Sequence, residues 1–504
     1  MSNEATTVHP SVFGNLTVPR RSGLLGLSFG GSLALVPIIL LIIILVAFGF
    51  MAIAIIVLAA TIVAIALSKL TRKENHSFFG RRMLRFAQRR KERTQQHLYI
   101  AGPTGKGTPD GATRLPGLMA RSELSDQTDS FGEPFGMIRL SGNGVHNYSV
   151  VLETHPDGEA LIDQDEMERR VALWGAWLSQ RGSDEGIRGA SVTIESSPDS
   201  GLRLNRLLHE NRTEDSPEFS RTVTTEIRDT FQSGAPQVVA RITVTFSGKR
   251  LDGGSGDRGT AEMAEEIGNR LPAIRAGLAG TGAGSVRPCT AQQITDFTRV
   301  AYDPTVATTV EEMQADGGTG LRWEDAGPSF ARDDFDLYRH DRAVSKSWTM
   351  WEGPNGHFTA DSLKRALSPL PGVLRKRVTL LYRPIATDKT TAIVQQEQND
   401  ALFAQSQTRG DARAMQRLAA ARKTASEEAQ GAGLTRFGVI LTITSQNSED
   451  FRRWDRQVPG LFSRARLRVR PALANQAVTF QAALPLGLVL PDHMLIPDEI
   501  REMF

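Results

Sequence analysis

Residues 284–293 read GSVRPCTAQQ, and residues 468–476, far downstream, read RVRPALANQ. In both places a short strand pattern closes on Arg-Pro and a helical pattern follows. Five residues match at a constant spacing between the two stretches: Val286, Arg287, Pro288, Ala291 and Gln293 correspond to Val469, Arg470, Pro471, Ala474 and Gln476. Agreement in residue identity and in element order indicates an internal repeat.

The segments upstream of the two stretches repeat in the same order. The strand patterns ASVTIESSP (190–198) and KRVTLLYRP (376–384) each precede a pair of helical patterns, and a strand, a helix and the Arg-Pro strand then follow. We therefore expect two related α+β lobes, and the ferredoxin-like fold is one candidate for each lobe. The predicted boundaries are 98–304 for the first lobe with a hairpin at its start, 305–375 for a connector with a helix and a strand, and 376–504 for the second lobe.

A polar helical pair is predicted as an insertion in the second lobe, at 387–431. It is rich in Gln, Ala and Arg, and Gly410 interrupts it. Thin apolar seams run along it, with Leu402 and Phe403 in the first helix and Met415 in the second. Such an exposed arm is typical of a partner contact, although an ordinary surface hairpin remains an open alternative.

The composition narrows the class of protein. Of the 504 residues, 40% are apolar, which is enough for packed cores. The single cysteine, Cys289, allows neither an intrachain disulfide nor a cysteine-rich metal site. The net charge of +3 hides a basic excess in residues 1–93 and a mildly acidic remainder. Direct nucleic-acid binding by the remainder is not expected, because phosphate contacts need a basic surface.

An uncharged stretch from Ser22 to Ser68 predicts a membrane anchor. It is too long for one comfortable crossing of a hydrocarbon core about 30 Å thick, so a two-helix transmembrane hairpin at 23–68 is favoured over one tilted helix. Basic residues flank both ends of the stretch, which favours a cytoplasmic tail at 1–22 and a cytoplasmic body. The expected location is the inner membrane, as a multi-pass protein with both termini in the cytoplasm.

A basic juxtamembrane neck follows at 69–97. Phe79, Met83 and Phe86 recur at helical spacing with arginines between them, which is typical of a helix lying on an anionic membrane surface. A positively charged flank without surface binding is the alternative. Seven residues are the candidates for membrane-surface contact: Arg81, Arg82, Arg85, Arg89, Arg90, Lys91 and Arg93.

The stretch GPTGKGT (102–108) resembles a phosphate-binding loop but does not satisfy its pattern. Ile100 stands where the first glycine is required, and Gly107 stands where the magnesium-binding Ser or Thr is required. The following turn residues, 108–111, begin no helix, so the helix dipole that would face a phosphate is also missing. Nucleotide binding here is therefore not expected.

Other catalytic and metal-binding patterns are equally weak. Tyr338-Arg339-His340-Asp341 with Ser345 contains the residue types of nucleophilic catalysis, but without the context of a nucleophile turn, so a structural role is favoured over a hydrolase. Asp333, Asp334 and Asp336 suggest either a cation site or, more simply, a solvated acidic turn. We expect no enzymatic activity, no cofactor and no metal.

The sequence resembles a family of actinobacterial integral membrane proteins associated with conjugative elements and type IV secretion genes. The segments that carry the resemblance are AGPTGKGTPDGATRLPGL (101–118), NYSVVLETHPDGEALIDQ (147–164), LWGAWL (173–178), LAGTGAGSVRPCT (278–290), VAYDP (300–304), DLYRHDRAVSKSW (336–348), KRVTLLYRP (376–384), GAGLTRFG (431–438) and AALPLGLVLP (482–491). The resemblance implies a PrgI-like two-helix anchor fused to a body like the non-catalytic N-terminal region of the secretion ATPase.

The function implied by the resemblance is a non-enzymatic inner-membrane scaffold of a conjugative secretion apparatus. Its partners would be a secretion ATPase acting in trans and other secretion subunits, in a homo-oligomer or a larger complex, without direct nucleic-acid contact. Three alternatives remain: a type VII secretion core component with a similar anchor, a membrane-tethered hydrolase using His340 and Ser345, and a DNA-binding module.

Overall fold

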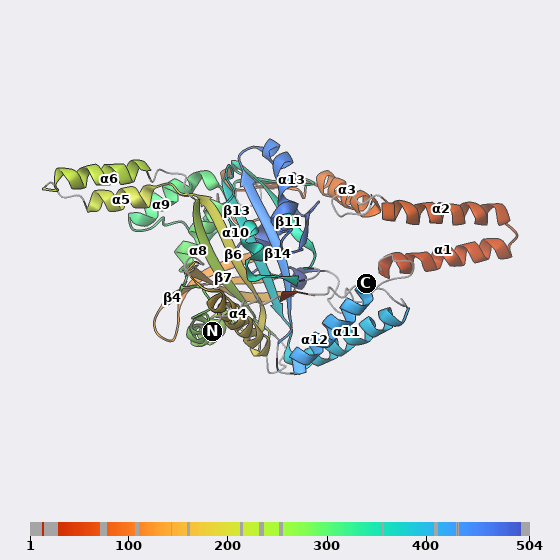
Figure 1. Cartoon of the computed structure of the whole chain (residues 1–504). Coiled ribbons are helices and arrows are strands. Elements are labelled where there is room, and N and C mark those ends of the chain that lie inside the picture. Colours follow the sequence, from red (N-terminus) through yellow and green to blue (C-terminus); the bar gives the residue numbers. More distant parts are fainter. Residues whose placement is uncertain are drawn as a thin grey trace, which may run out of the picture.

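The computed structural model shows an α+β protein built around one large antiparallel sheet (Figure 1). The structure describes residues 13–14, 29–70, 78–105, 110–142, 144–158, 162–211, 215–230, 236–250, 256–354, 357–407, 412–429, 431 and 433–494. The predicted N-terminal tail at 1–22 lies outside these residues, apart from the short strand β1 (Phe13–Gly14), which pairs with β12 (His357–Phe358).

The first half of the body is built on a unit of four strands and two helices in the order βαββαβ. These are β5 (Val145–His155), α4 (Gln164–Ser183), β6 (Ile187–Pro198), β7 (Pro236–Ser247), α7 (Thr260–Ala276) and β8 (Ser285–Pro288). Hydrogen bonding places the strands in the order β8-β5-β7-β6, with every neighbouring pair antiparallel. This order, fourth-first-third-second, is that of the ferredoxin-like split βαβ arrangement. The helix α8 (Ala291–Tyr302) follows, capped at its start by Thr290, whose side chain and that of Gln293 form a capping box.

The second half repeats this arrangement. Its strands are β11 (Ala343–Glu352), β13 (Arg375–Pro384), β14 (Thr435–Ser445) and β15 (Arg468–Pro471), in the sheet order β15-β11-β14-β13. Its helices are the short α10 (Lys364–Leu367), α13 (Phe451–Leu461) and α14 (Gln476–Ala482). The first strand, β11, falls within the predicted connector at 305–375, so this half of the sheet begins earlier along the chain than 376.

The two halves join edge to edge through β6 and β13, which makes one continuous sheet. Thr193 lies directly opposite Thr379, and their hydroxyl oxygens are 3.2 Å apart. On either side of this pair, Val192 faces Leu380 and Ile194 faces Val378. The flanking positions therefore exchange as they would across a two-fold axis, and that axis passes between Thr193 and Thr379.

The repeated VRP triplets occupy corresponding places in the sheet. Pro288 lies opposite Leu152 of β5, and Pro471 lies opposite Trp348 of β11. The next residue in each copy donates its backbone N–H to the same strand: Cys289 to the carbonyl of Val151, and Ala472 to that of Ser347. Because proline has no N–H, it fits a short strand at the edge of a sheet.

Other elements extend the sheet and its surroundings. The strands β2 (Leu98–Ile100), β9 (Phe330–Asp333) and β10 (Tyr338–His340) continue the sheet beyond β11, and β4 (Pro134–Gly142) and β3 (Ser122–Thr128) continue it beyond β5. The helix α9 (Ala307–Ala315) follows α8. Two helical pairs are inserted at corresponding places, α5 (Leu202–Glu210) with α6 (Glu218–Thr230) between β6 and β7, and α11 (Thr387–Gln407) with α12 (Ala412–Ala429) between β13 and β14.

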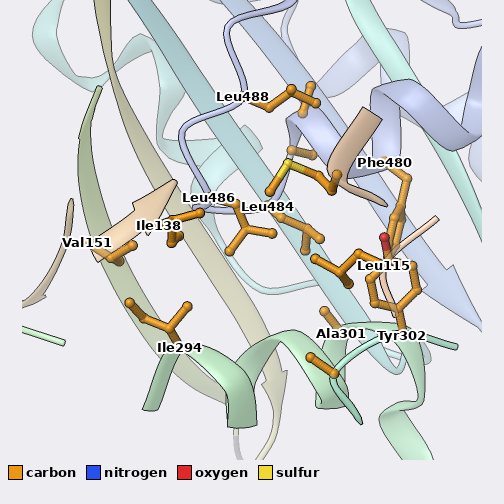
Figure 2. Close-up of a cluster of buried hydrophobic side chains, with 14 of the residues drawn as sticks. Leu115, Ile138, Val151, Ile294, Ala301, Tyr302, Phe480, Leu484, Leu486 and Leu488 are labelled. Carbon is orange, nitrogen blue, oxygen red and sulfur yellow. The ribbon is translucent and has the colours of Figure 1, made fainter. Parts of the chain in front are cut away.

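The sheet carries a packed layer on each face. Because side chains alternate across a strand, Val150 and Leu152 of β5 pack with α4 and α7, whereas Val151 packs with the opposite layer. That opposite layer contains α8, α14 and the segment 483–494, which we call the C-terminal strap. Leu484, Leu486 and Leu488 of the strap belong to the same buried cluster as Ile138 and Val151, and Figure 2 shows Leu486 next to Ile138. Residues near the end of the second half therefore complete the core of the first.

The predicted transmembrane hairpin at 23–68 is wrong. Within the described ranges, no helix combines the length and the apolar character needed to cross a membrane. The helices α1 (Phe29–Ala47) and α2 (Met51–Leu70) do form a pair, which projects to the right away from the sheet (Figure 1), but their side chains are described only over 35–47 and 51–66. Each of these stretches is shorter than the about 20 residues that a span requires. The predicted multi-pass inner-membrane localisation, with both termini cytoplasmic, is overturned by the same finding.

Candidate functional site

His340 and Ser345, the residues of the hydrolase alternative, are brought together by the hairpin of β10 and β11. The imidazole Nε2 lies 2.8 Å from Ser345 Oγ, and Nδ1 lies 2.5 Å from the carbonyl oxygen of Tyr302. Because a carbonyl oxygen only accepts, Nδ1 carries the proton and Nε2 accepts from the serine hydroxyl. This is the hydrogen-bond pattern of a base beside a nucleophile.

The surroundings of the pair favour a structural role. Both side chains are 0% exposed, so a substrate could not reach either of them without a rearrangement of the core. Burial lowers the pKa of His340 to about 4, which keeps the imidazole neutral. Ser345 Oγ is also 2.7 Å from Thr444 Oγ1, and the corresponding pair in the first half, Ser149 and Thr245, is 3.0 Å apart. The serine thus belongs to a repeated hydrogen bond between the first and third strands of each half.

The glycine-rich loop forms a tight turn. Gly102–Thr104 make a short 3₁₀ helix, and the N–H of Gly105 bonds to the carbonyl of Gly102. A Cβ on Gly105 would lie 2.7 Å from the backbone of Ala101, so the glycine is required by close approach of the chain to itself. Lys106 and the residues up to Pro109 lie outside the described residues.

The neck contains a helix, α3 (Phe78–Arg93), that contacts the body. Lys91 Nζ donates to Asp333 Oδ2 at 3.1 Å and to the carbonyl of Ala474 at 2.6 Å, and Gln88 donates to the carbonyl of Asp333 at 2.8 Å. Burial raises the pKa of Asp333, and the Lys91 ammonium opposes that rise. Of the other six basic candidates, Arg81 is half-buried and the rest are exposed: Arg82, Arg85, Arg89, Arg90 and Arg93. Their role at a membrane surface stays a prediction.

The acidic residues near Asp333 are engaged by cations of the chain itself. Asp334 pairs with Arg332 at 2.8 Å and with Arg339 at 3.0 Å, and Asp336 lies 3.5 Å from Lys346. Among the described residues, no group of three His, Cys, Asp or Glu side chains is arranged to hold a metal ion.

A buried charge cluster lies where the two halves of the sheet meet, and the sequence reasoning did not identify it. The Glu195 carboxylate accepts hydrogen bonds from Arg375 and from Arg377, whose Nε lies 2.8 Å from Oε2. Burial raises the pKa of Glu195, but the guanidiniums of Arg377, Arg375 and Arg241 outweigh burial and lower the pKa to about 2. The residues come from β6, β7 and β13, so only strand pairing brings them together.

The two inserted helical pairs form arms at different ends of the sheet. Each arm connects the second and third strands of its half, and because β6 and β13 are antiparallel neighbours the arms leave in opposite directions. Figure 1 shows α5 and α6 on the left and α11 and α12 at the lower right. The α5–α6 arm exposes Leu207, Phe219 and Val223, and the α11–α12 arm exposes Leu402, Phe403 and Met415. Partner binding was predicted for the second arm alone, although the repeat itself implied that the first arm occupies an equivalent position.

Comparison with known proteins does not identify a family. No protein family matches the chain, and no curated protein is significantly similar to it. The class of protein is therefore defined by the structure alone: a duplicated α+β body with a helical arm on each half.

Proposed function

We propose that this protein is a non-enzymatic scaffold subunit of a secretion apparatus related to conjugative type IV systems, and that it docks a separate ATPase. The resemblance in sequence suggests the apparatus. The observation that best supports the scaffold role is the pair of helical arms, because each arm exposes large apolar side chains away from the sheet core. The side chain of Phe219 is 78% exposed and that of Phe403 is 65% exposed. Aromatic side chains and Met are enriched at protein interfaces, where burying them contributes to binding.

The packing of the arms supports this role. The polar surface of α11 and α12 leaves only a few apolar side chains outside the contact between the two helices, and those few are the anchors that an interface would bury. A duplicated body with diverging arms can hold two partners, or two parts of one partner, at a fixed separation. The buried pair of His340 and Ser345 supplies no competing argument for a hydrolase, because neither side chain has exposed surface.

Affinity purification of the full chain from its native cells, with quantitative mass spectrometry of the bound proteins, tests the proposal. The wild type is expected to recover an ATPase, and a Phe403→Asp, Met415→Asp double variant is expected to recover it at least tenfold less well, which corresponds to about 1.4 kcal/mol or more of binding free energy. Phe131→Asp is the matched control, because Phe131 is 83% exposed in the turn between β3 and β4, outside both arms.

The control variant should recover the ATPase as well as the wild type does. Absence of any ATPase from the wild-type preparation would overturn the docking role. Undiminished recovery by the double variant would show that the α11–α12 arm is not the docking surface, and the Phe219→Asp variant then tests the α5–α6 arm by the same measurement.

A further inference from the structure

The strand β3 forms one end of the large sheet, and within the described residues no further strand pairs with its outer edge. Its pairing with β4 shows which backbone groups point outward. Gly136 lies opposite Asp126, yet the N–H of Gly136 bonds to the carbonyl of Cys289 and not to β3. Asp126 therefore occupies a non-hydrogen-bonded position with respect to β4, and its own N–H and C=O point to the outer edge.

The alternation of an antiparallel pair extends this result to the neighbouring residues. Thr128 lies opposite Pro134, which has no N–H to donate. The next pair along is hydrogen bonded, since the N–H of Asp129 bonds to the carbonyl of Glu133. Both observations fit the same alternation, so Leu124 and Thr128 also direct their backbone groups outward.

Both ends of this edge are covered by the chain itself. The N–H of Ser122 bonds to the carbonyl of Met119. The carbonyl of Ser122 accepts a hydrogen bond from Trp323 Nε1 at 3.2 Å. At the other end the carbonyl of Thr128 faces α7, where a Cβ on Gly268 would lie 3.1 Å from it. The open part of the edge is therefore the middle of the strand.

A second copy of β3 fits this open part. Leu124 and Asp126 have outward backbone groups that bond to no other described residue, and an open edge is a template for pairing with another strand. Two antiparallel β3 strands related by a two-fold axis at Ser125 place Leu124 of one copy opposite Asp126 of the other, which uses every one of these groups. Glu123 then faces Gln127, so no two like charges lie directly opposite each other.

The neighbouring registers fit less well. Centring the pair on Asp126 would set two carboxylates directly opposite each other, which is destabilising. Centring it on Leu124 would place Asp126 opposite Ser122, whose outward groups are already bonded. A shift of one residue would set outward groups against residues whose backbone groups point to β4. The register centred on Ser125 is therefore the best one.

The chain already uses this mode of association. The strands β6 and β13 join the two halves edge to edge, antiparallel and about a two-fold axis. The strand β9, which takes the place of β3 in the second half, carries β2 on its outer edge. We propose that two copies of the protein pair through β3, antiparallel and centred on Ser125, so that the sheet continues across a dimer. Such a contact uses the same surface on both copies and closes at two.

Site-specific disulfide formation in the full chain tests the dimer and its register. On the axis, in a non-hydrogen-bonded pair, two Cβ atoms lie about 4.5 Å apart, which is close to the separation in a disulfide. Ser125→Cys should therefore form a covalent dimer on mild oxidation, seen by non-reducing gel electrophoresis. The matched control Glu123→Cys should form at least fivefold less, because its two thiols would lie about 13 Å apart along the strands. The native Cys289 is buried and does not compete.

Two further measurements use the same register. An equimolar mixture of Glu123→Cys and Gln127→Cys should cross-link at least fivefold more than either variant alone, because these positions face each other. In analytical ultracentrifugation the wild type should form a dimer that dissociates on dilution. Ser125→Lys should weaken that dimer at least tenfold, because two ammonium groups would then lie opposite each other on the axis.

Three results would overturn the proposal. The first is equal cross-linking of Ser125→Cys and Glu123→Cys, and the second is a wild type that stays monomeric at every concentration. The third is a Ser125→Lys dimer as tight as that of the wild type, which would show that copies associate through another surface. The disulfide measurements contain no ATPase, so their outcome is independent of whether an ATPase binds the arms.

Discussion

Replacing Glu195 with Gln should destabilise the protein at neutral pH more than any change to a surface ion pair. The variant leaves the buried guanidinium of Arg377 and the half-buried guanidinium of Arg375 without the carboxylate that now accepts their hydrogen bonds. Breaking a buried pair by removing one partner costs about 3–5 kcal/mol. The pKa of Glu195, lowered from 4.5 to about 2, gives an independent value of about 3 kcal/mol for the net stabilisation of its charged form. Urea denaturation at pH 7 measures the loss directly.

The pH dependence of this loss has a definite sign. Because the carboxyl has a lower pKa in the folded chain than in the unfolded chain, its stabilisation is complete above about pH 5. It is lost as the pH falls from 4.5 towards 2, where the folded state also takes up the proton. The difference in stability between the wild type and Glu195→Gln should therefore shrink steadily over that range.

Glu123→Gln is the matched control. Glu123 pairs with Arg139 at 3.0 Å, but its side chain is 65% exposed, so its loss should cost less than about 1 kcal/mol at any pH. The reasoning is refuted if Glu195→Gln is no more destabilising than Glu123→Gln, or if its effect is the same at pH 3 as at pH 7.

Three further outcomes are expected from urea denaturation. Burial lowers the pKa of His340 from 6.5 to about 4, so on acidification the imidazole takes up its proton in the unfolded chain before it does so in the folded chain. This residue should therefore lower wild-type stability by about 3 kcal/mol between pH 7 and 4. The variant His340→Gln should lack this decrease, and a pH profile identical to that of the wild type would contradict the reasoning. Gly487→Ala should destabilise the protein by more than about 3 kcal/mol, because the φ of Gly487 is +75° and a Cβ there would lie 2.5 Å from Thr245 Oγ1. The matched control Gly132→Ala should cost only about 1 kcal/mol, because Gly132 has a similar φ of +82° but open space around it. Thr379→Val should lower the free energy of unfolding by about 1–3 kcal/mol, and Thr193→Val should lower it less. Of these two threonines, only Thr379 donates its hydroxyl to the carbonyl of Ala483, at 2.7 Å. Equal losses of stability in the two variants would show that this hydrogen bond contributes nothing.

Local patterns in the sequence predicted several parts of the fold. The α+β class followed from strand and helix periodicities, because side chains that alternate between the two faces of a strand leave a different sequence pattern from side chains on one face of a helix. The matching VRP triplets pointed to a repeated unit, and the structure places both triplets at the same point of their strands. The uncharged stretch at 22–68 was misleading, because hydropathy reports the composition of a segment and does not establish a helix that spans a membrane.

The candidate sites were much harder to predict. His340 and Ser345 attracted attention because they are close in sequence and chemically suggestive, yet only the packing of Tyr302, Thr444 and the sheet around them reveals their burial. The Glu195 cluster has no local signature at all, because Arg375 and Arg377 become neighbours of Glu195 only in the folded sheet.

The sequence by itself determined much of the order of the elements, the presence of two related units, and the mismatch between the glycine-rich loop and the phosphate-loop pattern. These properties depend on residue type and on spacing over a few turns or strands. The tertiary structure alone decided that the two units share one sheet, that Glu195 meets Arg375 and Arg377, and that the C-terminal strap crosses to the other half. The physical reason is that register between distant strands is set by the packing of whole faces, and a one-residue shift in register would turn every side chain of a strand to the opposite layer.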